Sequence, residues 1–280
     1  MPTFTTADDV TLHFTDSGGD GRPLVLVHGW PLSGEAFARN VPAFREAGLR
    51  VVTYDRRGFG RSGRPAGPVD YDVLSDDLAA LVEHLDLRGA VLLGFSMGGG
   101  EVARYFTRHG SERIAGAIFS GSITPALCIT DDNPDGAMPI DGFQGMADQC
   151  AADRDGFLDQ FVTWFYSTAD GGLQVDEDTR QAALAIAHQS DPHAAAQAIL
   201  LWATDLRDDC RAIDVPTLVI HGDGDINVPL AKSSARMSEF VKGCTLDVIE
   251  GGPHGVNDSQ PERWQNSILD FVRGVETQTR

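Results

Sequence analysis

The sequence lacks long apolar runs, a recognisable leader and clustered cysteines. No apolar run approaches the roughly 20 residues that a membrane-spanning helix needs. Residues 1–9 hold neither the basic segment nor the apolar core of a signal peptide. No Cys-x-x-Cys pair occurs, which argues against a zinc site or a disulfide framework; the four scattered cysteines are Cys128, Cys150, Cys210 and Cys244. We therefore expect a cytoplasmic protein with free thiols, no bound metal and no membrane partner.

Positive charge is also scarce. Lys and Arg number 22 against 41 Asp and Glu, a formal net charge of −19 over 280 residues. Such a surface repels phosphate groups, so nucleic acids and anionic membranes are not expected partners. The hydrophobic fraction of 42% is sufficient for a real core, which excludes a disordered chain.

Short apolar runs that end at a glycine or a polar residue recur along the chain. They show no polar alternation, which is typical of parallel strands buried on both faces. The runs are 24–27, 50–54, 90–93, 114–120, 217–220 and 245–249, with 12–14 in an antiparallel pair at the sheet edge. Helical periodicity lies between them, at 76–85, 101–109 and 261–275. The alternation predicts an α/β fold with a doubly wound, mostly parallel eight-stranded sheet flanked by helices.

One long stretch breaks this alternation. Residues 123–209 hold no strand-like run but several helical segments, such as 157–165, 178–188 and 194–201. We interpret the stretch as a helical lid inserted into a core formed by residues 1–122 and 210–280. Ligands of such sheets bind beyond the carboxyl ends of the strands, where the polar and glycine-rich turns of this chain fall.

The candidate nucleophile is Ser96. Gly94-Phe95-Ser96-Met97-Gly98 matches the Gly-x-Ser-x-Gly nucleophile elbow, a sharp turn between a strand and a helix. The pattern alone is weak evidence, because it arises by chance in glycine-rich chains. Its position after an apolar strand and before a helix that starts with small residues supplies the missing context.

A serine hydroxyl needs a base to take its proton and an acid to orient that base. Among eight histidines, His254 alone lies in a loop between the last strand and the last helix, where it would end beside Ser96. The acid should follow the strand 217–220, and Asp225 is the better candidate there, with Asp223 left to brace the turn. His221 and His28 are interpreted as residues that brace loops.

The oxyanion of the tetrahedral intermediate needs two backbone N–H donors. We expect one from Met97, directly after the nucleophile, and one from Trp30 in the turn that starts at His28. Pro31 has no N–H and offers only a carbonyl, so it is a candidate for binding water or hydroperoxide near the acyl group. The candidates for lining the acyl pocket are Phe157, Phe161, Trp164, Phe165 and Trp202, although their helical spacing also suits packing of the lid on the core.

Two other patterns suggest different sites and fail on inspection. Asp223, Asp225 and Asn227 alternate as in a calcium loop, but Val228 and Ser234 stand where that loop needs glycine and glutamate. The segment 58–63 fits the Gly-x-Gly-x-x-Gly dinucleotide fingerprint, but the residues 64–68 that follow cannot start the helix that this motif requires. We therefore expect no cofactor.

Several segments resemble the cofactor-free haloperoxidases and aryl esterases of the α/β-hydrolase superfamily. The resemblance covers most of the chain and is weakest at 139–209. It rests on HGWPL at 28–32, YDRRGFG at 54–60, GFSMGGGEVARY at 94–105, DDNP at 131–134 and PHG at 253–255. The elbow segment is highly specific, whereas the triad pattern alone would fit many hydrolases.

The resemblance implies a serine esterase whose acyl-enzyme is attacked by hydrogen peroxide as well as by water. The peroxyacid released would then oxidise bromide or chloride without haem or metal, and proline at position 31 resembles members strong in peracid formation. It also implies small esters or carboxylic acids as substrates and a homo-oligomer of three or more chains. A γ-lactamase, a carbon–carbon bond hydrolase and a catalytically silent receptor or scaffold remain as alternatives.

Overall fold

The computed structural model describes residues 2–64 and 67–278. Met1 of the segment inspected for a leader, and Pro65 and Ala66 of the segment after the glycine-rich loop, lie outside these residues. Of the helices within 2–64 and 67–278, none has the length and apolarity needed to cross a bilayer.

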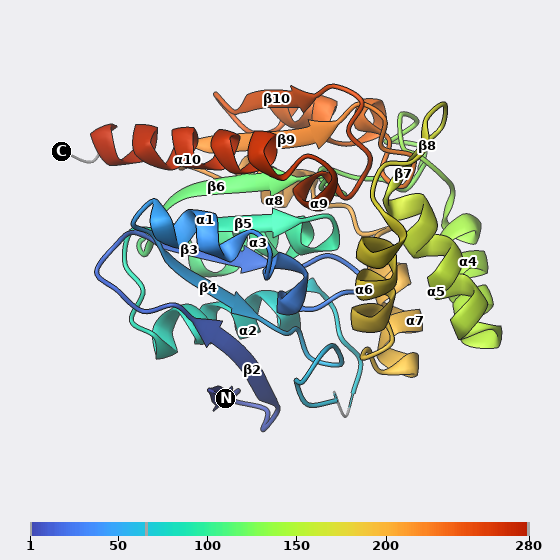
Figure 1. Cartoon of the computed structure of the whole chain (residues 1–280), viewed down its shortest axis with the longest axis horizontal. Coiled ribbons are helices and arrows are strands. Elements are labelled where there is room, and N and C mark those ends of the chain that lie inside the picture. The colour runs from blue at the N-terminus through green and yellow to red at the C-terminus, as the bar shows by residue number, and fades with distance from the viewer. Residues whose placement is uncertain (1, 65–66, 279–280) are drawn as a thin grey trace.

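A single eight-stranded sheet runs through the molecule (Figure 1). Its six central and C-terminal strands are parallel, and β1 and β2 are antiparallel at one edge. In spatial order the strands are β1 (Thr3–Thr5), β2 (Thr11–Asp16), β4 (Arg50–Tyr54), β3 (Pro23–Val27), β5 (Ala90–Phe95), β6 (Ile114–Ser120), β9 (Thr217–Gly222) and β10 (Thr245–Ile249). The predicted fold class and the antiparallel edge are confirmed.

The central strands of the sheet are buried, whereas the last strand, β10, is partly exposed. Every residue of β3, β5 and β9 is buried, as runs without polar alternation predict. The expectation of burial on both faces is wrong for β10, where Leu246 and Val248 are each 40% exposed. The reason is that β10 is an edge strand that pairs only with β9.

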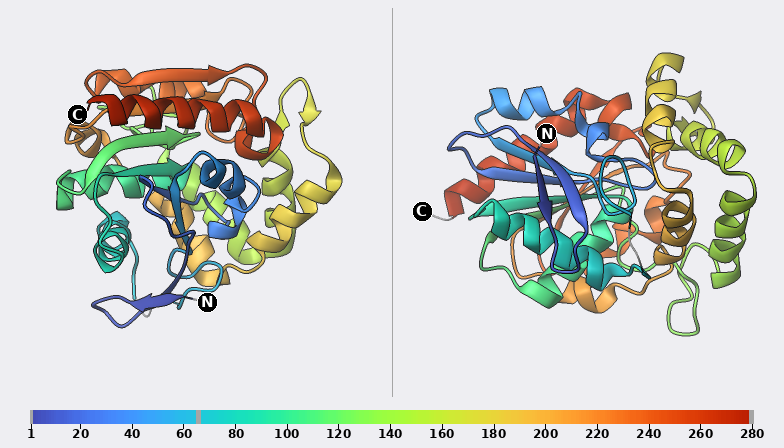
Figure 2. Two further views of the ribbon diagram at one scale, coloured as in Figure 1. Left: turned by 60° about the vertical axis from the view of Figure 1, so that its left-hand side comes forward. Right: turned by 90° about the horizontal axis from the view of Figure 1, so that it is seen from below.

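Helices cover both faces of the sheet (Figure 2). One face carries α2 (Tyr71–His84), α3 (Met97–His109) and α8 (Arg207–Arg211), and the other carries α1 (Val41–Glu46) and α10 (Pro261–Gln278). Two hydrophobic clusters result, with Trp264 of α10 in one and Val102 of α3 in the other. Shorter elements complete the loops: η1 (Gly34–Phe37), η2 (Leu230–Lys232), η3 (Ser234–Glu239) and α9 (Val256–Ser259).

The segment between β6 and α8, which we call the helical insertion, lies beyond the carboxyl ends of the strands (Figure 1). It contains α4 (Ile140–Ala152), α5 (Arg154–Phe165), α6 (Glu177–Ala187), α7 (Pro192–Leu201) and a hairpin of β7 (Ser167–Thr168) and β8 (Gly172–Leu173). The hairpin and α4 have no counterpart among the elements expected from the sequence. The next helix, α8, is bound to α3, since Asp209 accepts hydrogen bonds from Arg104 and Thr107 at 2.8 and 2.6 Å.

Candidate active site

Ser96 lies on a strained turn between β5 and α3. Its φ of 53° and ψ of −120° are rarely adopted by a residue with a side chain, and such strain is concentrated at functional sites. Two glycines permit the turn because the helix starts very close to the sheet. A Cβ on Gly98 would lie 2.5 Å from the carbonyl oxygen of Val27, and one on Gly94 would lie 2.6 Å from that of Gly98.

His254 and Asp225 meet at the carboxyl edge of the sheet. His254 follows β10 and Asp225 follows β9, and the His254 Nδ1 is 2.6 Å from the Asp225 Oδ2. The imidazole ring packs edge-on against Phe95 and Phe165, with ring centroids 5.3 and 4.9 Å apart. Its Nε2 is buried and has no hydrogen-bond partner among the described residues. Ser96 and His254 line the same cavity, so the structure brings the three predicted triad residues to one place.

The surroundings of Asp225 keep its carboxylate ionised. Burial raises the pKa of this carboxyl, but the attraction of His254 and hydrogen bonds from His221 and His254 outweigh it and hold the pKa well below its usual value. The Oδ1 also accepts hydrogen bonds from the backbone N–H groups of Asn227 and Val228 at 2.9 and 2.8 Å. The carboxylate is therefore fixed at both oxygens.

His221 and Asp223, the other histidine and aspartate beside Asp225, form hydrogen bonds that hold the surrounding loops in place. The His221 Nε2 is 2.8 Å from the Val228 carbonyl and 3.1 Å from the Asp225 Oδ2, and its Nδ1 is 2.7 Å from the Ser234 hydroxyl. A carbonyl can only accept, so Nε2 carries the proton. Asp223 is exposed and accepts a hydrogen bond from the Gly251 N–H at 2.7 Å. Its carboxylate braces the turn that leads to His254.

The two expected oxyanion donors come from the residue after Ser96 and from a turn close to it. Met97 is the first residue of α3, so its N–H is one of the donors that a helix start leaves without an intrahelical acceptor. Trp30 follows Gly29, which lies so close to Ser96 that an added Cβ would be 3.0 Å from the Ser96 Cβ. The turn that holds Trp30 therefore lies against Ser96.

A buried arginine fixes the turn that carries Trp30. The Arg56 backbone N–H donates to the His28 Nε2 at 3.0 Å, and its guanidinium donates to the His28 carbonyl at 2.7 Å and to Glu101 at 2.8 Å. Because the His28 Nε2 accepts, the proton lies on Nδ1, which donates to the Gly29 carbonyl at 2.9 Å. Burial and the Arg56 charge lower the pKa of His28 well below its usual value. Burial also raises the pKa of Glu101 and lowers that of Arg56 to about 10.

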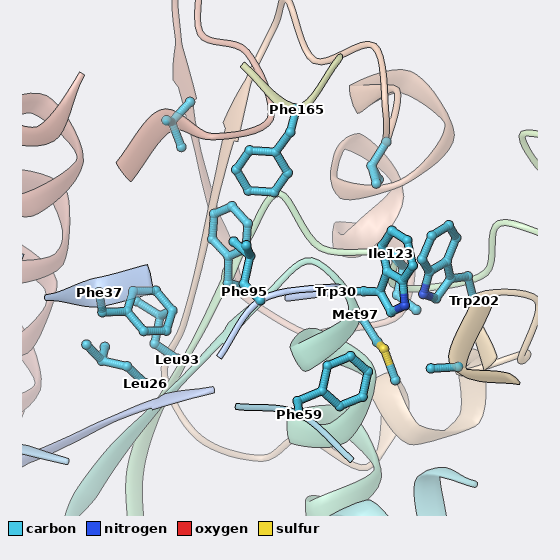
Figure 3. Packing of buried hydrophobic residues seen from close by; sticks show 14 of the residues in the cluster. Leu26, Trp30, Phe37, Phe59, Leu93, Phe95, Met97, Ile123, Phe165 and Trp202 are labelled. Carbon is cyan, nitrogen blue, oxygen red and sulfur yellow. The ribbon is translucent and has the colours of Figure 1, made fainter. Parts of the chain in front are cut away.

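The cavity beside Ser96 has a volume of about 220 Å³. Of the predicted pocket residues, Phe161, Trp164 and Trp202 line it, whereas Phe157 and Phe165 are not among its described lining residues. Phe161 and Trp202 also pack on Trp30, with ring centroids 4.7 and 5.2 Å from the Trp30 ring. Figure 3 shows Trp202 beside Trp30. The two roles left open by the sequence thus coexist. Pro31 is buried and is not among the described residues that line this cavity. A larger cavity of about 540 Å³, between the loop 56–69 and α7, has neither Ser96 nor His254 in its described lining.

Other lining residues were missed by the sequence reasoning. They come from the β6–α4 connection, from α4 and from the loop after Asp225; they are Ile123, Leu127, Ala137, Met138, Phe143, Met146, Ile226, Asn227, Val228 and Pro229. Only the residues directly after Asp225 carried a signal, because they share its place at the carboxyl edge of the sheet.

The two rejected patterns have structural roles. Asp223 and Asp225 are used as described above, and no group of three potential metal ligands occurs within the described part of the chain. In the glycine-rich loop, the Gly58 N–H donates to the Gly63 carbonyl at 2.9 Å and the Arg61 N–H to Asp55 at 2.9 Å. The next helix, α2, starts only at Tyr71.

These features together define an α/β hydrolase. The sheet is mostly parallel, Ser96 lies on a strained turn after β5, and the Asp225–His254 pair follows β9 and β10. The model of the α/β hydrolase fold family matches residues 22–261, and the chain belongs to this family. It is an enzyme of the kind that includes non-heme haloperoxidases and esterases.

Three relatives illustrate this similarity. The chain is 38% identical to a non-heme chloroperoxidase of Streptomyces lividans over 98% of this chain and 100% of the relative. It is 34% identical to a bifunctional esterase/perhydrolase of Acinetobacter calcoaceticus, covering 96% and 98%. The crystal structure of a bromoperoxidase from Bacillus anthracis superimposes with a TM-score of 0.92 at 37% identity, covering 97% and 100%.

Proposed function

We propose that the protein hydrolyses small carboxylic esters through an acyl-enzyme on Ser96 and also transfers the acyl group to hydrogen peroxide. The observation that carries this proposal is the state of His254. Its Nδ1 is held by Asp225 at 2.6 Å, while its Nε2 has no partner within the described residues and the ring lines the cavity of Ser96. A base oriented in this way is ready to accept a proton from the serine hydroxyl.

The reaction has two half-reactions. In the first, the Ser96 Oγ attacks the ester carbonyl carbon, the His254 Nε2 takes its proton, and the N–H groups of Trp30 and Met97 hold the oxyanion. The alcohol leaves with the proton returned by His254. In the second, water or hydrogen peroxide attacks the acyl carbonyl and gives its proton to His254, and Ser96 leaves with that proton. The product is a carboxylic acid or a peroxyacid.

The names of the relatives support hydrogen peroxide as an acceptor of the acyl group in addition to water. These relatives are named as a chloroperoxidase, an esterase/perhydrolase and a bromoperoxidase. A peroxyacid released into solution oxidises bromide, so halogenation needs no oxidant bound to the protein. When the reaction starts from a free carboxylic acid, the acid acylates Ser96 with loss of water, and hydrogen peroxide then releases the acyl group as the peroxyacid.

Hydrolysis of p-nitrophenyl acetate by the wild type and Ser96→Ala tests the first half-reaction. We expect the variant to lose at least about 10³-fold in kcat/KM. Ser111→Ala is the matched control, because Ser111 precedes β6 at the opposite end of the sheet. Equal turnover by the wild type and Ser96→Ala would refute the mechanism, and absence of turnover in both would favour a silent hydrolase-fold scaffold.

Bromination in acetate, hydrogen peroxide and bromide at mildly acidic pH tests the second half-reaction. We expect bromination that survives a chelator, requires a carboxylic acid and is lost in Ser96→Ala. Bromination that persists without any carboxylic acid would refute the peroxyacid route.

A further inference from the structure

Two residues that line the Ser96 cavity each carry a buried side-chain N–H donor without a partner among the described residues. The Trp202 Nε1 and the Asn227 Nδ2 are buried, and neither atom has a hydrogen-bond partner among the described residues. Trp202 is only 8% exposed. The neighbouring Trp30 differs, because its Nε1 donates to the Ala195 carbonyl at 2.8 Å. An unsatisfied buried donor destabilises the folded protein, so such groups are rare unless a ligand or water satisfies them.

Both donors belong to the site of the reaction. Trp202 is the C-cap residue directly after α7, and Asn227 stands two residues after Asp225. Both line the cavity together with Ser96 and His254. Figure 3 shows the Trp202 nitrogen on the side of the indole that turns toward Trp30 and Ile123. Ile123 lines the same cavity. The backbone N–H of Asn227 donates to Asp225, which fixes the backbone that carries this side chain relative to the triad.

The remaining lining excludes charged acyl groups. Apart from His254, the described lining holds no ionisable side chain, and most of it is apolar. A second carboxylate on the substrate would lose its hydration without gaining a cation, and an ammonium group would gain no carboxylate. A neutral oxygen that accepts hydrogen bonds suits two unpaired N–H donors in an apolar cavity.

We propose that the cavity selects acyl groups that carry a neutral acceptor oxygen on the chain, such as a keto or ether oxygen, bound by the Trp202 Nε1–H and the Asn227 side-chain amide. The inference rests on the proposed ester hydrolysis at Ser96 and adds the substrate class. A site with donors for an oxygen rejects the analogue that lacks it, because the donors then stay unpaired.

Pairs of isosteric p-nitrophenyl esters test this selection. The pairs are methoxyacetate with butanoate, 3-methoxypropanoate with pentanoate, and 4-oxopentanoate with 4-methylpentanoate, so that the oxygen is sampled at several positions. For each pair the ratio of kcat/KM, oxygenated over alkyl, is measured in the wild type and in Trp202→Phe and Asn227→Leu. Differences in chemical reactivity cancel when the ratios of two proteins are compared.

In at least one pair we expect the ratio to fall about tenfold in each variant, as expected for one lost hydrogen bond. Trp164→Phe is the matched control. It makes the same chemical change in the same cavity, but Trp164 is 45% exposed at the rim, so the ratio should stay within about twofold.

The outcomes separate the two proposals. Esters hydrolysed by the wild type with ratios unchanged in both variants would overturn the selection and leave the hydrolase function intact. A ratio that falls equally in Trp164→Phe would also overturn it. If Trp202→Phe does not fold, Asn227→Leu decides alone, because the backbone N–H that binds Asp225 is retained. A wild type that hydrolyses none of the esters would refute the hydrolase function and, with it, this inference.

Discussion

The Nδ1 of His254 lies 2.6 Å from the Oδ2 of Asp225, while the Nε2 of the same ring has no partner among the described residues. The carboxylate can only accept, so Nδ1 carries the proton and Nε2 presents its lone pair to the cavity. The two residues come from loops that follow adjacent strands, β9 and β10. The pair thus sets both the tautomer and the direction of the base.

Replacement of Asp225 by Asn should remove this control. The amide cannot stabilise the imidazolium and favours the wrong tautomer, so we expect kcat/KM for p-nitrophenyl acetate at neutral pH to fall about 10³- to 10⁴-fold. Asp223→Asn is the matched control, because Asp223 is an exposed carboxylate in the same loop. A change within about threefold is expected there. Comparable losses in both variants would contradict the assignment of Asp225 as the acid.

A methyl group on Gly98 should destabilise the fold. The new Cβ would lie 2.5 Å from the Val27 carbonyl oxygen, which is backbone and cannot rotate away. We expect Gly98→Ala to lower the free energy of unfolding by about 1–3 kcal/mol in urea titrations. Gly145→Ala in α4 is the control. Its Cβ would meet nothing within 4 Å, and helix propensity predicts a gain of up to about 1 kcal/mol. An equal response of the two variants would contradict the close contact.

His28 should make stability depend on pH. In the folded protein its pKa is well below the usual 6.5, so as pH falls the unfolded chain takes up a proton that the folded protein does not. Folding stability is therefore lost below about pH 6.5. Between pH 7.5 and 5.5 the stability advantage of the wild type over His28→Asn should shrink by about 1.4 kcal/mol, measured by urea unfolding. A constant difference would show that His28 titrates normally in the folded protein.

Pro31→Leu tests the role given to the turn after Trp30. Leucine lacks the ring that fixes φ, so the backbone carbonyl proposed to bind hydroperoxide is no longer held in one orientation. We expect the ratio of acetate-dependent bromination to ester hydrolysis to fall, by about tenfold if one hydrogen bond to hydroperoxide is lost. Bromination and p-nitrophenyl acetate hydrolysis are measured on the same preparation, so a loss of folded protein cancels. An unchanged ratio would show that Pro31 has no role in perhydrolysis.

The sheet and the Ser96 turn were predictable because their signals are local. Strands buried on both faces read as unbroken apolar runs, and the close approach of α3 to β3 demands glycine at 98. The placing of Asp225 and His254 needed one rule of topology, that the carboxyl ends of parallel strands meet at one edge.

The cavity and its supports were not predictable, because they depend on side chains that meet across the fold. Arg56 reaches Glu101 over 45 positions, and Arg236 binds Asn133 over 103. The same holds for Trp202, whose unpaired N–H becomes visible only when its partners can be checked in space. Helix α4 was missed even though Phe143, Ala147 and Cys150 recur at helical spacing.

Rapid quenching of the wild type with p-nitrophenyl acetate, followed by peptide mass spectrometry, tests the central claim most directly. The account predicts one acetyl group on the Ser96 hydroxyl within the first turnover, lost faster when hydrogen peroxide is added and recovered as peroxyacetic acid. Turnover with Ser96 never acetylated, or with the acetyl group on another residue, would contradict it.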